Sequence, residues 1–305
     1  MNSFTRRQIV LTSALAPFLR SARTATLDQV HLGITSDEID EDLRRAAIFI
    51  HQHGLRYAEL RSIWNKYNTA QPLEKVREAK ALLDEYQLKT SIADTAIFKN
   101  PLPPDTGEGK LALDQQWTLL DDAMERAKIL GTDKLRIFAF TYKGGGNPDT
   151  AAYPRIYEVL REAARRAKTR GLRLAVENVA DSYVWTGAQS ADMLKAVKND
   201  NLGLVWDPNN AASKGETPFP DGLRLLDVAR IFHVHVRDFK HRPDGKVEWA
   251  AVGQGEFDNT AHIRALLKAG YKETFNLETH WRGPGGKAAS TETSLAGLMK
   301  QIERV

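Results

Sequence analysis

Four short stretches in the second half of the chain decide the fold: LRLAVEN at 172–178, LGLVWDP at 202–208, IFHVHVRD at 231–238 and FNLETHW at 275–281. Each is an apolar, β-branched run that predicts a strand buried on both faces. Each also carries an acidic or imidazole side chain near its carboxyl end, in the order Glu177, Asp207, His235 and Glu278. Such a group is costly to bury unless it is paired or coordinated, so the repetition indicates a shared ligand.

Strand and helix patterns alternate from His31 to the end of the chain. We predict eight strands, at 31–35, 57–61, 89–94, 134–140, 172–178, 202–207, 231–238 and 275–279. Amphipathic helices are clearest at 73–86, 114–130, 153–169 and 190–198. Eight alternations in about 275 residues predict an α/β fold, a (β/α)8 TIM barrel, with residues 26–305 as one catalytic domain. A doubly wound open sheet fits less well, because the first strand is not followed by a glycine-rich phosphate turn.

In a barrel, the carboxyl ends of the strands form the open face where active sites lie. The four side chains are therefore expected at one mouth. Two long loops, at 96–113 and 282–290, are expected to shape access to it.

The first 25 residues resemble an export leader. Arg6 and Arg7 stand in Thr-Arg-Arg-Gln-Ile-Val, which is similar to a twin-arginine signal, and an apolar run follows at 9–19. That run is about half the roughly 20 residues needed to cross a bilayer, so no membrane span is expected. We expect a periplasmic or otherwise exported protein, or a cytoplasmic one if the leader is not used.

The formal net charge of +4 belongs to this leader. Its four arginines are accompanied by no acid, and without them 39 basic residues face 39 acidic ones. The remainder of the chain therefore has no global charge that would favour nucleic acid. With no cysteine, thiolate chemistry and disulfides are excluded.

Three carboxylates and one imidazole form a hard, oxygen-rich ligand set. Such a set suits one divalent ion, Mn²⁺, Mg²⁺ or Co²⁺, better than a sulfur-rich structural zinc site, with catalytic Zn²⁺ retained as an alternative.

The sequence resembles the sugar phosphate isomerase/epimerase family of xylose isomerase-like TIM barrels. Members of this family include ketose 3-epimerases, hydroxypyruvate isomerase and inosose dehydratase. The resemblance covers nearly all of the chain after the leader. It rests on AELR at 58–61, VEN at 176–178, WDPNN at 206–210, HVHVRD at 233–238, VGQGEFD at 252–258 and LE at 277–278.

The resemblance implies that Glu177, Asp207, His235 and Glu278 are the metal ligands. It also implies that Glu177 and Glu278 are the catalytic acid/base pair, moving a proton on and off the carbon beside a carbonyl. His233 is expected to be a core histidine, and Arg237 and Asp238 to support the site or anchor loops.

Departures from the epimerase pattern concern the residues that face substrate. Asn210 replaces a histidine, Tyr183 replaces a glutamate, and His241 replaces an arginine. A strict ketose 3-epimerase is therefore not expected. An exported enzyme would meet a free sugar or sugar derivative rather than a phosphorylated one.

Further substrate contacts are expected near the strand ends. Lys143 could contact an anionic group, and Trp185 and Trp281 could stack on a sugar ring. His280 could protonate a leaving group. Glu59 lies at a strand end with Arg61. The simplest interpretation is an ion pair supporting the barrel mouth, and Glu59 is also a candidate substrate contact.

Three alternatives stay open. The same enolising residues could serve a lyase or deglycosidase that cleaves 3-keto-glycosides by elimination. A multi-zinc endonuclease of the same superfamily would need more histidines than the eight in this chain provide at strand ends. A non-catalytic sugar-binding protein would not need all four ligands. The sequence leaves the oligomeric state open, a homo-oligomer included.

Overall fold

The computed structural model describes residues 30–142 and 146–305. The proposed leader and Lys143 lie outside the described residues. Within the described part, no helix combines the length and the apolarity needed to cross a membrane.

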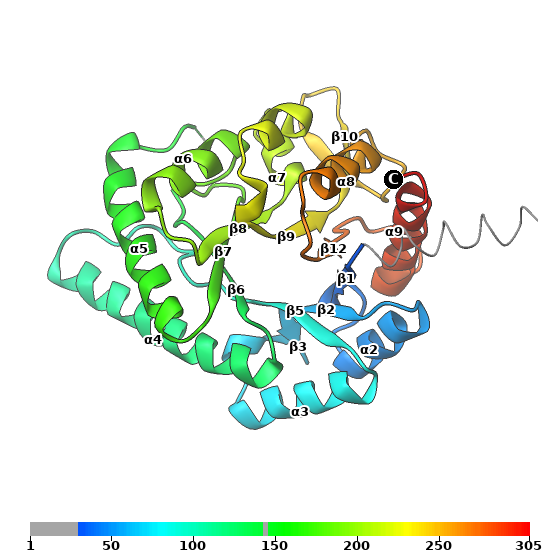
Figure 1. Cartoon of the computed structure of the whole chain (residues 1–305), viewed down its shortest axis with the longest axis horizontal. Helices are drawn as coiled ribbons and strands as arrows, with labels where there is room; N and C mark the ends of the chain where they lie inside the picture. Colours follow the sequence, from blue (N-terminus) through cyan, green and yellow to red (C-terminus); the bar gives the residue numbers. More distant parts are fainter. Residues whose placement is uncertain (1–29, 143–145) are drawn as a thin grey trace, which may run out of the picture.

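Eight parallel strands close into a barrel, as predicted, and helices surround it (Figure 1). Around the barrel the order is β1, β12, β9, β8, β7, β6, β5, β2. The strands are β1 (Leu32–Thr35), β2 (Tyr57–Leu60), β5 (Lys89–Asp94), β6 (Lys134–Ile137), β7 (Arg173–Glu177), β8 (Leu202–Trp206), β9 (Ile231–Val236) and β12 (Phe275–Leu277). All eight predicted strands are therefore confirmed, and those that carry the four ligand candidates are consecutive neighbours.

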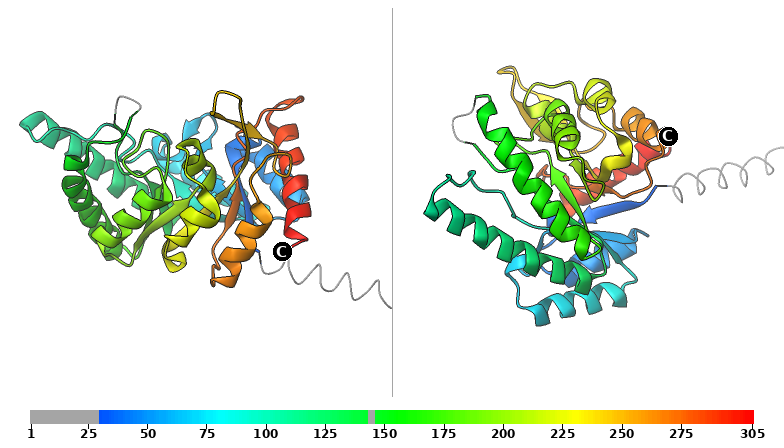
Figure 2. Two further views of the ribbon diagram at one scale, coloured as in Figure 1. Left: turned by 90° about the horizontal axis from the view of Figure 1, so that it is seen from above. Right: turned by 60° about the vertical axis from the view of Figure 1, so that its left-hand side comes forward.

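The helices pack their apolar faces on the outside of the barrel. They are α2 (Leu43–Gln52), α3 (Leu73–Glu85), α4 (Gly107–Leu130), α5 (Tyr153–Thr169), α6 (Gly187–Val197), α7 (Pro208–Ser213), α8 (Asn259–Lys268) and α9 (Gly286–Ile302). Figure 2 shows α4 and α5 running side by side along one flank. Helix α4 ends at Leu130, and the following Gly131 has a φ of 73°, the left-handed conformation that glycine adopts without strain.

The two predicted loops were too long. Helix α4 begins at Gly107, where the Thr106 side chain accepts a hydrogen bond from the Gly109 amide. Two glycines in this first turn have low helix propensity, so the sequence pattern did not predict a helix there. Gly109 is needed there because a Cβ would lie 1.9 Å from the Pro104 carbonyl oxygen. The second loop likewise ends where α9 begins, at Gly286.

Two small antiparallel hairpins were not predicted. One pairs β3 (Ser62–Ile63) with β4 (Lys66–Tyr67), and the other pairs β10 (Asp238–His241) with β11 (Val247–Ala250). Both follow the carboxyl ends of barrel strands, so they add walls to the open mouth.

Candidate metal centre and active site

The four ligand candidates converge because their strands are parallel neighbours. Glu177 is the last residue of β7, and Asp207 and Glu278 directly follow β8 and β12. His235 lies inside β9, opposite Asn276 of β12. All four side chains are buried. The strand register thus brings three carboxylates and one imidazole to a single point at the mouth.

That point is the Nδ1 atom of His235. It lies 3.2 Å from Glu278 Oε2, 3.6 Å from Asp207 Oδ2 and 3.7 Å from Glu177 Oε1. One ligand atom from each of the four residues lies within 4.8 Å of every other. Ligands on opposite sides of a Zn²⁺ or Mn²⁺ ion are about 4–5 Å apart, twice a typical bond of roughly 2.0–2.6 Å. The spacing therefore fits one shared divalent ion.

Two of the candidate ligand atoms are also free to bind an ion, because neither takes part in a hydrogen bond within the part of the chain that the structure describes. His235 Nδ1 and Glu278 Oε2 are buried, and neither has a hydrogen-bond partner among the described residues. Buried polar atoms usually have a hydrogen-bond partner, so two unpartnered ones that face each other fit a place where both can bind one cation. The donor set of three carboxylates and one imidazole is chemically suited to that role.

Three arginines hold the carboxylates in place, of which Arg136 and Arg237 are buried and Arg61 is partly exposed. Arg136 Nη1 lies 3.1 Å from Glu177 Oε2 and 2.9 Å from Asp94 Oδ2. Arg61 binds Glu278 Oε1, and Arg237 binds Asp207 Oδ2. Glu177 and Glu278 thus each give one oxygen to an arginine and turn the other toward His235.

The arginines and histidines also keep the two glutamates ionised. Burial opposes ionisation of Glu177, but Arg136 and His235 outweigh it and lower its pKa. For Glu278, burial is outweighed by His280, His235 and Arg237, which hold its pKa well below the usual range. Both carboxylates are therefore available as bases at neutral pH.

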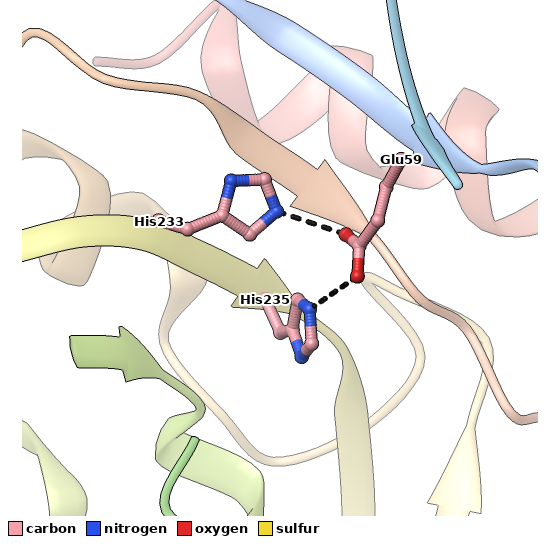
Figure 3. Close-up of side chains that lie close together, drawn as sticks. All are labelled: Glu59, His233 and His235. Atoms are coloured by element: carbon pink, nitrogen blue, oxygen red, sulfur yellow. Dashed lines mark hydrogen bonds and ion pairs between the residues drawn. The ribbon is translucent and has the colours of Figure 1, made fainter. Parts of the chain in front are cut away.

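A second carboxylate layer lies beneath the centre (Figure 3). Glu59 comes from β2 and is fully buried. Its Oε2 lies 2.8 Å from His233 Nε2, and its Oε1 lies 3.0 Å from His235 Nε2. Burial raises the pKa of Glu59, but the two imidazoles outweigh it and hold the pKa well below its usual value. An ionised carboxylate only accepts hydrogen bonds, so both Nε2 atoms donate and His235 Nδ1 faces the centre.

This arrangement corrects one prediction. Glu59 and Arg61 do not pair with each other, because Glu59 faces inward to the histidines while Arg61 binds Asp37 at 3.0 Å and Glu38 at 2.8 Å. Glu59, expected also as a substrate contact, lies below the ligand layer and is not among the residues that line the cavity above it.

A cavity of about 410 Å³ opens directly above the centre. Its lining combines cations, carboxylates and aromatic rings: Arg61, Tyr67, Lys99, Arg136, Glu177, Val179, Asn210, Arg237, Trp249, Glu278 and His280. Asn210 and His280 were expected as substrate contacts and both line it. Asn210 also donates its amide to Asp207 Oδ2 at 3.2 Å, linking the cavity wall to the ligand layer.

Three other expected substrate contacts lie elsewhere. Trp185 does not line the cavity, because its indole NH donates to the Asn210 carbonyl at 2.8 Å and Lys214 lies over its ring. Trp281 packs against Gly283 on the loop before α9. His241 is exposed on the β10–β11 hairpin and pairs with Glu256 at 2.7 Å. The hairpin turns this side chain outward, which the sequence pattern did not reveal.

The supporting residues behave as expected. His233 is a core histidine whose Nε2 bonds to Glu59 while its buried Nδ1 has no hydrogen-bond partner among the described residues. Arg237 bonds to both Asp207 and His280. Asp238 anchors a loop by accepting backbone hydrogen bonds from Gly253, Gly255 and Phe257, among others.

Several cavity residues were not singled out from the sequence. Arg136 had a signal, because an arginine inside the apolar run KLRIFAF is costly to bury without an anionic partner. Lys99 and Tyr67 had no such signal in the sequence. Lys99 lies on the loop after β5 and Tyr67 on the β3–β4 hairpin, and only the folded barrel brings these segments to its mouth. Trp249 lies on β11, in a hairpin that the sequence did not predict.

A second acidic group adjoins the centre. Glu38, Glu278 and His280 also lie close enough to share an ion. Glu38 already accepts bonds from Arg61 and Arg282, each at 2.8 Å. These two arginines neutralise it, so we do not place an ion there.

A family model described as xylose isomerase-like TIM barrel matches residues 48–301. The chain belongs to this family. Among curated proteins it is 31% identical over 128 residues to inosose isomerase of Bacillus licheniformis, covering 40% of this chain and 45% of that protein. It is 30% identical over 149 residues to 3-dehydroshikimate dehydratase of Pseudomonas aeruginosa, covering 47% of this chain and 23% of that protein. The match thus spans less than half of each of these curated relatives.

Solved structures agree on the fold. The crystal structure of the IolI protein with a bound zinc atom superposes with a TM-score of 0.73 at 20% identity, covering 90% of this chain and 99% of that chain. A D-allulose 3-epimerase from Methylomonas in complex with D-allulose gives 0.70 at 17% identity, covering 91% and 98%. These comparisons confirm the predicted barrel family.

Proposed function

We propose that this protein is a divalent-metal-dependent isomerase or epimerase that enolises a non-phosphorylated sugar or sugar derivative, with Glu177 and Glu278 as its acid/base pair. One observation carries the proposal: two ionised glutamates from β7 and β12 face the same imidazole nitrogen at the floor of a polar cavity. The curated relatives are named inosose isomerase and 3-dehydroshikimate dehydratase, and both of these reaction types are compatible with proton removal beside a carbonyl.

Glu177, Asp207, His235 and Glu278 would hold the ion. When bound, a divalent ion supplies positive charge that stabilises the oxyanion of an enediolate. The zinc atom in the IolI structure, which shares this fold, supports a divalent ion without fixing its identity here.

The side chains of the protein perform the proton transfer. Glu278 approaches from β12 and Glu177 from β7, so they flank a substrate carbon placed above His235. One glutamate removes the proton and the other returns one, on the same carbon in epimerisation or on its neighbour in isomerisation. Arg61 and Arg136 hold the outer oxygens, which fixes the inner oxygens in direction. Trp249, whose ring lies 4.7 Å from the Arg237 guanidinium, supplies an apolar wall on which a sugar ring can stack.

A pair of variants at residues on either side of β12 tests this assignment. Glu278→Gln keeps the size of the side chain and removes the base, so we expect solvent-deuterium exchange into a ketone substrate such as inosose to fall by about 10²–10⁴-fold. Glu273→Gln changes the glutamate at the opposite end of β12, where it binds Lys134 and Arg173, and serves as the control. Equal exchange in the two variants would exclude Glu278 as a base.

Elimination is the second candidate, and His280 favours it. Arg237 Nη1 donates to His280 Nδ1 at 2.7 Å, so in the neutral ring the proton is on Nε2. That Nε2 lies 3.3 Å from Glu278 Oε1, which places a proton donor beside a proposed base at the cavity. The same enolisation followed by departure of a β-oxygen would give a lyase or deglycosidase.

A change at His280 separates the two outcomes. For a 3-keto-glycoside, His280→Gln should lower the rate of glycosidic cleavage relative to the rate of deuterium exchange, because only cleavage needs the leaving group protonated. A parallel loss of both rates would argue against His280 as the acid for elimination.

We further propose that residues 1–25 direct export and that residues 26–305 form the catalytic domain. The support is the Arg6-Arg7 motif with its apolar run. Cell fractionation of the full chain and of the Arg6→Lys/Arg7→Lys double variant tests it. Export should be lost in the variant, and equal export would contradict a twin-arginine leader.

A further inference from the structure

The cavity above the centre carries more positive than negative charge. Four cations line it, Arg61, Lys99, Arg136 and Arg237, against the carboxylates Glu177 and Glu278. The three arginines are already neutralised by buried acids. Arg61 binds Asp37, Glu38 and Glu278; Arg136 binds Asp94 and Glu177; and Arg237 binds Asp207.

Lys99 is the exception. Within residues 30–142 and 146–305 its side chain forms neither an ion pair nor a hydrogen bond, and its ammonium lies 4.6 Å from the centroid of the Phe138 ring. Arg136 lies over the same ring at 5.2 Å. Partial desolvation lowers the pKa of Lys99, and Arg136 adds to this, while the carboxylate of Glu177 opposes it. The side chain is nevertheless exposed in the open cavity, so among the described lining residues its ammonium is the cation that a bound anion can reach without displacing an acidic partner.

We propose that Lys99 selects a substrate that carries a carboxylate. This inference rests on the proposed function, because it assigns the substrate class for the same cavity. The ketone would lie over His235 between the two glutamates, and its carboxylate would face the ammonium of Lys99. A single unpaired lysine matches the single charge of a carboxylate better than a phosphate dianion, which proteins bind with several donors. The enzyme would then act on a keto acid or sugar acid, rather than on a neutral sugar.

Two unreactive cyclic polyols test whether the protein prefers a ligand with a carboxylate, and this test does not depend on catalysis. Shikimate carries a carboxylate and myo-inositol does not, and neither has a ketone to enolise. Calorimetric titration of the metal-loaded protein should show tighter binding of shikimate by at least about tenfold, the effect of one charge-assisted hydrogen bond. Lys99→Met should remove most of this preference, and Lys99→Arg should retain it.

Lys75→Met is the matched control. Lys75 also lies over an aromatic ring, 5.0 Å from the centroid of Trp64, but it is paired with Glu78 on the outer surface. This variant should keep the preference of the unmodified protein.

Several results would overturn the inference. They are equal binding of the two ligands by the unmodified protein, no shikimate binding up to ~10 mM, or a preference that survives in Lys99→Met. These outcomes are independent of enolisation. If deuterium exchange into neutral inosose proceeds while shikimate is not preferred, the proposed function stands and the carboxylate selectivity falls.

Discussion

Glu59 supports His235 from below, with 3.0 Å between Glu59 Oε1 and the His235 Nε2 atom that donates to it. The same carboxylate accepts from His233 at 2.8 Å. A buried carboxylate that fixes an imidazole in this way selects the tautomer and ring orientation of a metal ligand. The β2 strand therefore contributes to the centre although none of its residues would touch the ion.

Replacing this carboxylate should weaken metal binding. Glu59→Gln retains a carbonyl oxygen but loses the charge that two histidines share, so we expect affinity for Mn²⁺ or Zn²⁺ to fall about 10–100-fold. Competition with a chromogenic chelator measures this. His233→Gln leaves the Glu59–His235 bond in place and should cause a smaller loss. An equal or larger loss in His233→Gln would show that Glu59 does not act through His235.

Arg136 should be essential for stability. Its side chain is 3% exposed and lies between Asp94 and Glu177, so Arg136→Met leaves buried carboxylates without a counter-charge. We expect the free energy of unfolding in urea to fall by about 3–5 kcal/mol. Arg165→Met removes an exposed arginine paired with Glu162 and should change stability little. Similar effects of the two variants would contradict a buried charge network.

The barrel itself was predictable because each strand is an apolar run with a helix after it, and burial on both faces leaves a continuous signal. The four ligand candidates were recognisable because an ionisable side chain at the end of a buried strand has a desolvation penalty, which indicates an ion pair or a bound ligand. Lys99 and Trp249 carry no such signal. They reach the mouth through a loop and a hairpin whose direction depends on packing against the finished barrel. The outward turn of His241 depends on the same hairpin.

Because of His262, we expect the free energy of unfolding to decrease in acid. It is fully buried on α8 and accepts a hydrogen bond from the Trp206 indole at 3.2 Å. Burial lowers the pKa of His262 to about 3. In the unfolded chain His262 has a pKa near 6.5. Between about pH 6.5 and 3, this histidine is therefore protonated in the unfolded chain but not in the folded protein. Stability should fall with pH in this window by up to about 1.4 kcal/mol per unit.

His262→Gln provides the comparison. Glutamine can still accept from Trp206 but does not titrate, so the variant should lose less stability than the unmodified protein between pH 6.5 and 4. Urea unfolding at several pH values gives the two slopes. Parallel slopes would show that His262 is not the group responsible.

We predict that a metal held by Glu177, Asp207, His235 and Glu278 is required for enolisation. The most direct measurement is deuterium uptake from D₂O into inosose, 3-dehydroshikimate and free ketoses, before metal removal, after verified removal and after Mn²⁺ or Zn²⁺ is restored. We predict exchange at one carbon beside the carbonyl of at least one ketone, a loss of about 10²-fold or more without metal, and recovery on reloading. Exchange that is unchanged after metal removal, or absent from every ketone with stoichiometric metal bound, would contradict the claim.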